Sequence, residues 1–225
     1  MGQKVHPTAF RLGITQNWKS RWFSKKKYQE FLKEDYFIRN FLSKKIAKAG
    51  IYKIEIERSA NIINVIIFAA RPGIIIGRGG SGIEDLKSAT MKFLFRKKIK
   101  LPLKSNLRLL VEEVKSPESK AAVIAQNMAE QIEKRIPFRR VIKQGIDRIM
   151  QNKEVQGAKV MIGGRLGGNE IARREWLYKG KIPLQTLRAN IDFALVTAYT
   201  TYGTIGIKVW VYRKDEVSEA KSKNN

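Results

Sequence analysis

Cysteine is absent from this 225-residue chain, and histidine occurs once, at His6. Without cysteine there can be no disulfide, no thiolate metal site and no cysteine nucleophile. A single imidazole also excludes histidine metal clusters and leaves little room for histidine acid–base catalysis. An enzyme with this composition would depend on carboxylates, lysine or serine alone. We therefore predict no metal, no cofactor and no catalytic residue, and the lack of cysteine fits a reducing cytosol.

Long apolar runs and negative charge are also scarce. No apolar stretch reaches the roughly 18 residues of a membrane span, and the N-terminal MGQKVHPTAFRLG lacks the apolar segment of a secretory signal. Myristoylation is disfavoured because its motif requires Ser or Thr where His6 stands. By contrast, 45 Lys and Arg oppose 20 Asp and Glu, a net charge of +25. This excess predicts a polyanionic partner, and the missing membrane signals favour nucleic acid over a membrane.

The first half of the chain alternates between helical and strand-like patterns. Apolar periodicity predicts two helices, at 24–34 and 35–49, with Asp35 as a cap of the second. A β-hairpin, a helix and a strand follow at 52–58 with 62–70, 81–97 and 106–114. Residues 72–76 form either a strand or a short helix. The helix would make the element order αββααβ.

A new pattern of elements begins after residue 115, where Ser116-Pro117-Glu118 is typical of a helix start. Two helices are expected, to about 135 and at 138–151, and then strand-like runs at 157–168, 173–183, 190–201 and 204–213. The fold class is therefore α+β, with a second domain of two helices packed on a mixed or antiparallel sheet. We expect four regions: a basic N-terminal arm and helix (1–34), two domains (35–114 and 115–213) and a disordered tail (214–225).

The arm interleaves cations such as Lys4 and Arg11 with Phe10, Trp18 and Trp22. Charge and aromatic stacking together suit RNA. The alternative is a frayed terminus that packs a few aromatic side chains. Both interpretations remain open at this point.

The glycine loop in RPGIIIGRGGSGIEDLK, residues 71–87, admits three interpretations. Gly77 to Gly82 matches the dinucleotide pattern G-x-G-x-x-G, but the required acid about 20 residues later is replaced by Lys97, Lys98 and Lys100. The loop could also be a plain helix–helix turn. The third interpretation is a G-x-x-G clamp, Gly77-Arg78-Gly79-Gly80, in which glycines allow close approach to a nucleic-acid backbone. The surrounding α-β-β-loop-α-β unit resembles a type II KH domain, a family that clamps about four nucleotides in this way.

The expected helix at 138–151 is amphipathic, with Arg139, Arg140 and Lys143 opposite its apolar arc and Asp147 among them. This edge is either a solvated face or a stripe that contacts phosphates. Farther on, Glu170 and Glu175 could form a carboxylate pair. Because Arg165, Arg173 and Arg174 surround the pair, we favour salt bridges or RNA-facing loops over catalysis.

Long motifs spread over residues 1–212 make the chain resemble the family of bacterial-type small-subunit ribosomal protein three. They are MGQKVHPTAFRLGI, RPGIIIGRGGSGIEDL, FRRVIKQ, GGRLGGNEIARREW and IPLQTLRANIDFALVTAYTTYGTIGIKVWVY. The resemblance implies a structural role in the head of the small ribosomal subunit, in the cytoplasm or in an organelle that carries such ribosomes. It implies binding to 16S-type rRNA, contact with ribosomal proteins ten and fourteen, and, with proteins four and five, a place on the channel through which mRNA enters. It also implies that Arg139, Arg140 and Lys143 help to open structured mRNA.

This chain departs from its relatives in two places. Its clamp reads Gly77-Arg78-Gly79-Gly80 where relatives often have a lysine-rich G-K-x-G, so the cation is kept and a glycine is added. The basic segment at 96–105 is longer than is usual, which makes Lys97, Lys98 and Lys100 candidates for rRNA contact, together with Lys4, Arg11, Arg165, Arg173 and Arg174. A free KH-type regulator of mRNA and a nucleotide-dependent enzyme are the alternative functions.

Overall fold

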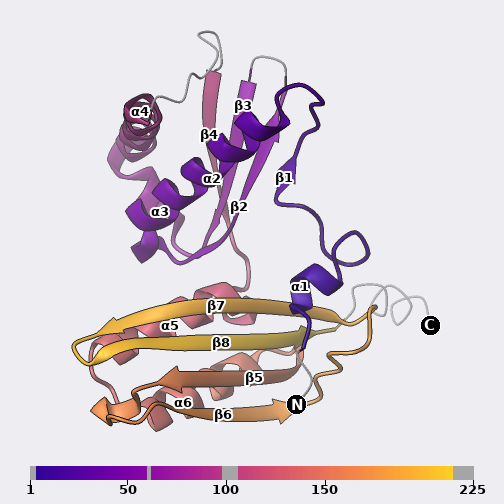
Figure 1. The fold of residues 1–225 in the computed structure, drawn as a ribbon, viewed down its shortest axis with the longest axis vertical. Coiled ribbons are helices and arrows are strands. Elements are labelled where there is room, and N and C mark those ends of the chain that lie inside the picture. The colour runs from indigo at the N-terminus through magenta and orange to yellow at the C-terminus, as the bar shows by residue number, and fades with distance from the viewer. Residues whose placement is uncertain (1–3, 60–61, 98–105, 215–225) are drawn as a thin grey trace. The chain divides into compact units, whose positions relative to one another are not determined.

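The computed structural model describes residues 4–59, 62–97 and 106–214 (Figure 1). The chain forms two compact units, one of residues Trp18–Lys115 and the other of Met1–Asn17 together with Ser116–Asn225. The expected N-terminal arm is therefore not a separate region, because its first 17 residues belong to the same unit as the C-terminal half. The tail predicted to be disordered lies, from residue 215 onward, outside the described residues.

The unit Trp18–Lys115 contains a four-stranded sheet in the order β1-β2-β3-β4. Its elements along the chain are β1 (Ser20–Arg21), α2 (Tyr28–Lys45), β2 (Ile51–Arg58), β3 (Ile62–Ala69), α3 (Pro72–Ile76), α4 (Ser81–Arg96) and β4 (Asn106–Glu113). The predicted hairpin is the antiparallel pair β2–β3, and β4 runs parallel to β3. Since Pro72–Ile76 is helical, the expected αββααβ order of a type II KH domain is confirmed.

Helix α2 corrects the prediction of two helices that meet at Asp35. Asp35 is not a cap but a buried residue inside one continuous 18-residue helix. Its carboxylate accepts hydrogen bonds from the Ser20 hydroxyl at 2.8 Å and the Trp22 indole at 2.7 Å. A capping residue would instead bind backbone N–H groups of its own helix. Helix α2 buries Ile38 and Leu42 in the core that it shares with the sheet.

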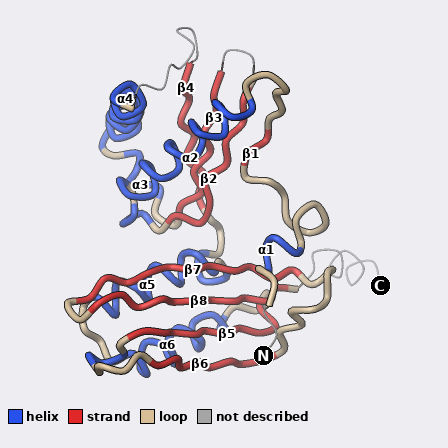
Figure 2. The backbone as a smooth tube through the Cα atoms, viewed as in Figure 1, coloured by secondary structure: helices blue, strands red, loops and turns tan. Residues whose placement is uncertain are grey.

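The other unit packs two long helices on one face of an antiparallel sheet (Figure 2). Its elements are α1 (Pro7–Phe10), α5 (Ala121–Glu133), α6 (Phe138–Gln151), β5 (Val155–Gly164), β6 (Arg173–Gly180), β7 (Asn190–Thr200) and β8 (Gly203–Arg213). The sheet order is β6-β5-β8-β7. The strand expected at 157–168 is shorter at its end than predicted, because Leu166–Gly168 forms a 3-10 turn with Gly167 at a positive φ. Alternate residues such as Ile207 and Val209 fill the core beneath the helices.

Arg11 ties the N-terminal segment to this second sheet. Its side chain is fully buried, and its guanidinium donates hydrogen bonds to the carbonyl oxygens of Ala189 at 2.8 Å, Thr186 at 2.8 Å and Leu184 at 2.9 Å. A fourth bond, of 3.1 Å, reaches the carbonyl of Pro7. All of these donors are used inside the protein. Arg11 is therefore a structural residue, and its prediction as an rRNA contact is corrected.

Asp192 caps helix α5 from strand β7. Its carboxylate Oδ2 accepts a hydrogen bond of 2.9 Å from the backbone N–H of Ala121, the first residue of α5. Burial raises the pKa of Asp192 above its ordinary value of 3.8, and the hydrogen bond to Ala121 opposes that shift. Burying the charged form of Asp192 costs desolvation energy. In return, its carboxylate accepts a hydrogen bond from an N–H group at the start of α5 that would otherwise have no partner in the helix.

Asp192→Asn should flatten the pH dependence of stability. With a raised pKa, the folded protein holds a proton that the unfolded chain has already released, so stability falls as the pH rises from 3.8 through the folded pKa. Asparagine keeps an acceptor for Ala121 but cannot ionise. Urea unfolding of both proteins at several pH values should show the variant gaining relative to the parent as the pH rises. A difference that does not change with pH would show that Asp192 titrates alike in both states.

Candidate nucleic-acid interface

The glycine loop connects α3 to α4 in a conformation that requires glycine. Gly77 has φ 69°, Gly79 has φ 62° and Gly80 has φ 84°, all in the region that side chains rarely adopt. Arg78 lies exposed between them, and the Ser81 hydroxyl donates a hydrogen bond of 3.0 Å to the Arg78 carbonyl. The loop therefore presents backbone and one cation at the surface.

Gly82, the last glycine of the apparent dinucleotide pattern, has a packing role instead. A Cβ at this position would lie 2.6 Å from the carbonyl oxygen of Ile75 and 2.9 Å from that of Ile76. Only glycine lets α4 begin so close to α3. The loop also follows a helix and a hairpin rather than the strand that a dinucleotide site needs, so that interpretation was wrong.

The flanks of the loop combine the features that a nucleotide requires. Ile75 is buried, but its neighbours Ile74 and Ile76 are 55% and 36% exposed. The N-cap residue of helix α4, Gly80, supplies no side-chain hydrogen bond to the helix start, where N–H groups can meet an anion. Exposed apolar surface beside an anion-binding helix start is the chemistry of a KH clamp.

Helix α6 presents the second cationic surface. Val141, Ile142, Ile146 and Ile149 are buried, which confirms the predicted apolar arc. On the other side, Arg139, Arg140 and Lys143 are all exposed. The buried arc holds the helix against the sheet, so the three cations are carried on a rigid element.

The acids near α6 are partly neutralised by neighbours on β6. Glu175 lies 3.7 Å from Arg139 and 3.5 Å from Arg173, which agrees with the predicted salt bridges, and Asp147 lies 3.5 Å from the Lys179 amine. Exposed pairs of this kind contribute at most about 1 kcal/mol. Phosphates can therefore replace these acids at little cost, and Arg173 extends the α6 surface onto β6.

Comparison with known proteins decides the family. A family model for the C-terminal domain of ribosomal protein S3 matches residues 128–211, and one for the KH domain matches 37–119. The chain is 46% identical over 224 residues to the small ribosomal subunit protein uS3 of Desulfosudis oleivorans, with 100% of both chains covered. The chain belongs to the uS3 family. The uS3 protein of Caldicellulosiruptor saccharolyticus is 50% identical over 96% of this chain and 93% of its own, and that of Clostridium botulinum is 49% identical over 100% and 97%.

Membership in the uS3 family makes this chain an RNA-binding protein of translation and not an enzyme. Among the described residues, no cluster of three or more acids or histidines could hold a metal. No helix within those residues is long and apolar enough to cross a membrane. The glycine loop lies inside the KH match, and Arg139, Arg140 and Lys143 lie inside the S3 match.

The remaining basic candidates of this uS3 chain differ in exposure and in their hydrogen bonds. Lys4 and Lys97 are exposed, whereas Lys98 and Lys100 lie outside the described residues. Arg165 is half-buried and donates to the carbonyls of Asn169 and Tyr202, so it braces the loop that follows β5. Arg174 is exposed and lies, by strand alternation, on the face of β6 opposite Arg173. Sequence patterns showed the charges but not this division between faces.

Proposed function

We propose that this chain is a structural component of the small ribosomal subunit head that binds 16S-type rRNA and contacts mRNA where it enters. The observation that carries the proposal is that Arg139, Arg140 and Lys143 are exposed on helix α6, whose opposite side packs in the hydrophobic core. The names of its uS3 relatives and the net charge of +25 support the same role. Its ribosomal neighbours would be proteins ten and fourteen, with four and five near the mRNA, in the cytoplasm or an organelle.

The mechanism is electrostatic and mechanical. Arg139, Arg140 and Lys143 hold the phosphates of one mRNA strand while translocation pulls the message through. Because α6 is anchored by buried side chains, it resists this pull and a hairpin opens against it. The clamp Gly77-Arg78-Gly79-Gly80 adds a second RNA contact through its backbone and the start of α4.

Replacing Arg139, Arg140 and Lys143 with alanine tests this function. Removing three contacts to a single strand should reduce the slope of log affinity against log salt by about 2. Subunits reconstituted with the variant should assemble normally, translate an unstructured message at the parental rate and slow several-fold at a stable hairpin. Equal speeds on both messages would refute the mRNA role.

A matched control removes the same charge elsewhere. Lys25, Lys26 and Lys33 are exposed in the other unit, so their alanine variant also loses three positive charges. It should retain the parental ratio of rates on structured and unstructured messages. A slowing equal to that of the α6 variant would assign the effect to net charge rather than to this helix.

A further inference from the structure

A hollow of about 410 Å³ lies on the face of the β6-β5-β8-β7 sheet that α5 and α6 leave uncovered. Gly206 follows and precedes the buried residues Ile205 and Ile207, so it faces away from the helices. It pairs across the strands with Gly163, which in turn pairs with Arg174. The two missing side chains create the hollow.

Gly163 and Gly206 leave open space on this face of the sheet. A Cβ at Gly206 would meet nothing closer than the Gly163 carbonyl at 3.9 Å, and the backbone there is not left-handed. At Gly163 a Cβ would lie 3.2 Å from Cγ of Arg174, so its absence lets the arginine lie across the strand. Glycine inside a strand weakens it and often marks the close approach of a ligand.

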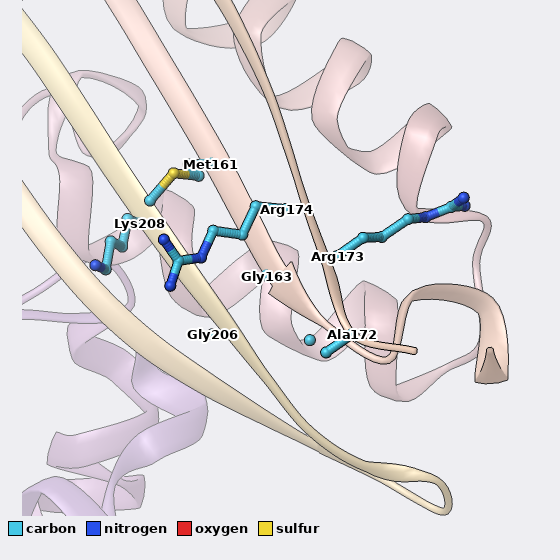
Figure 3. A pocket seen from close by; sticks show the side chains of 8 residues that line it. Met161, Gly163, Ala172, Arg173, Arg174, Gly206 and Lys208 are labelled. Atoms are coloured by element: carbon cyan, nitrogen blue, oxygen red, sulfur yellow. The ribbon is translucent and has the colours of Figure 1, made fainter. Parts of the chain in front are cut away.

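Two cations border the hollow without an acidic partner. Figure 3 shows the Arg174 side chain extending on the same side as Lys208 and Met161. Arg173 also lines the hollow, but its side chain extends away from these three and it pairs with Glu175. Within the described part of the chain, neither Arg174 nor Lys208 forms a salt bridge, and no acid lines the hollow. Among the residues that the structure describes, no acid neutralises their charge.

Aromatic surface continues from the hollow along the same face. Trp176 is the cross-strand partner of Met161 on β6 and is 59% exposed, and Tyr178, two residues on, is 63% exposed. Unpaired cations beside exposed rings suit RNA, since rings stack on bases and cations hold phosphates. A protein partner would have to bring acids of its own.

We propose that this hollow is a third RNA site, formed by residues other than those of the clamp and of α6, that binds single-stranded RNA. Arg174 and Lys208 hold adjacent phosphates, the floor of Gly163 and Gly206 receives one nucleotide, and Trp176 stacks with a base. The site assigns a role to the GGR and ARREW parts of the sequence that the α6 mechanism leaves unused.

Gly206→Val tests the site by filling it. Valine favours strands and its Cβ enters open space, so the urea midpoint should not fall. Fluorescence anisotropy of the full chain with a labelled 12-residue oligouridine should show affinity reduced about tenfold. Ultraviolet cross-links of the same RNA to peptides holding Trp176 or Tyr178 should be lost. Unchanged affinity and cross-links would overturn the proposal.

Charge variants supply an independent measurement. Arg174→Gln with Lys208→Gln should weaken oligouridine binding and reduce its salt dependence. The matched pair Lys153→Gln with Lys214→Gln, exposed residues away from the hollow, should do so less. The alanine variant of α6 should keep the Trp176 cross-link, which separates this site from the mRNA proposal. If Gly206→Val binds oligouridine normally but fails to join small subunits, the face docks a protein and the RNA site is refuted.

Discussion

Asp35→Ala should lower the free energy of unfolding of the unit Trp18–Lys115 by about 3–5 kcal/mol, the usual cost of breaking a buried ion pair. Asp35 is fully buried, and Arg58, whose side chain is 5% exposed, donates to it from Nε at 3.0 Å and from Nη2. The Ser20 hydroxyl and the Trp22 indole donate to the other oxygen. Alanine would leave a buried guanidinium and two further donors without this acceptor.

The cluster around Asp35 joins three segments that are distant in sequence. Arg58 also pairs with Glu34 at 2.6 Å and lies 4.6 Å from the centre of the Phe31 ring. Because Ser20 and Trp22 bind the same carboxylate of Asp35, the cluster connects β1 and the following loop to α2 and β2. Urea unfolding of the full chain, followed by tryptophan fluorescence and circular dichroism, measures the change.

Glu57→Ala is the matched control for Asp35→Ala. Glu57 pairs with Arg21 at 2.8 Å, but both side chains are more than a third exposed. Solvent screens such a pair, so its loss should cost less than about 1 kcal/mol. If the two variants were equally destabilised, the buried cluster would not be the support that its geometry indicates.

Arg11→Ala should destabilise the other unit by about 3 kcal/mol, since hydrogen bonds to charged groups each contribute roughly 1.5–3 kcal/mol and do not add fully. The variant removes the guanidinium that donates to the carbonyls of Leu184, Thr186 and Ala189, and it opens a buried volume. The unfolding transition of this unit should move to lower urea, and trypsin should cleave the N-terminal segment sooner.

Two variants test whether the planar guanidinium of Arg11 or only its positive charge stabilises the unit. Lys4→Ala removes an exposed cation from the same segment and should change stability by less than about 0.5 kcal/mol. Arg11→Lys keeps the charge but has one nitrogen instead of three, so it should recover only part of the loss. Full recovery of stability by Arg11→Lys would mean that the positive charge, rather than the planar guanidinium, stabilises the N-terminal segment.

Local patterns predicted the elements whose signal is carried by neighbouring residues. The apolar arc of α6 depends on spacings of three and four, and the predicted limits of this helix, 138–151, are those of the structure. The hairpin β2–β3 and the two domain folds followed from similar short-range signals. Where a polar side chain meets a distant partner, the same patterns misled, as at Asp35.

The sequence by itself determined the charge, the absence of thiol chemistry, the glycine pattern of the loop after α3 and the family motifs. These are properties of composition and of short stretches, so no fold is needed to read them. Only the tertiary structure decided that Arg11 binds carbonyls more than 170 residues away. It also decided that Gly163 on β5 pairs with Gly206 on the neighbouring strand β8. The reason is physical: a side chain's role is set by the groups that pack around it, and long-range strand pairing brings those groups from parts of the chain that no local pattern connects.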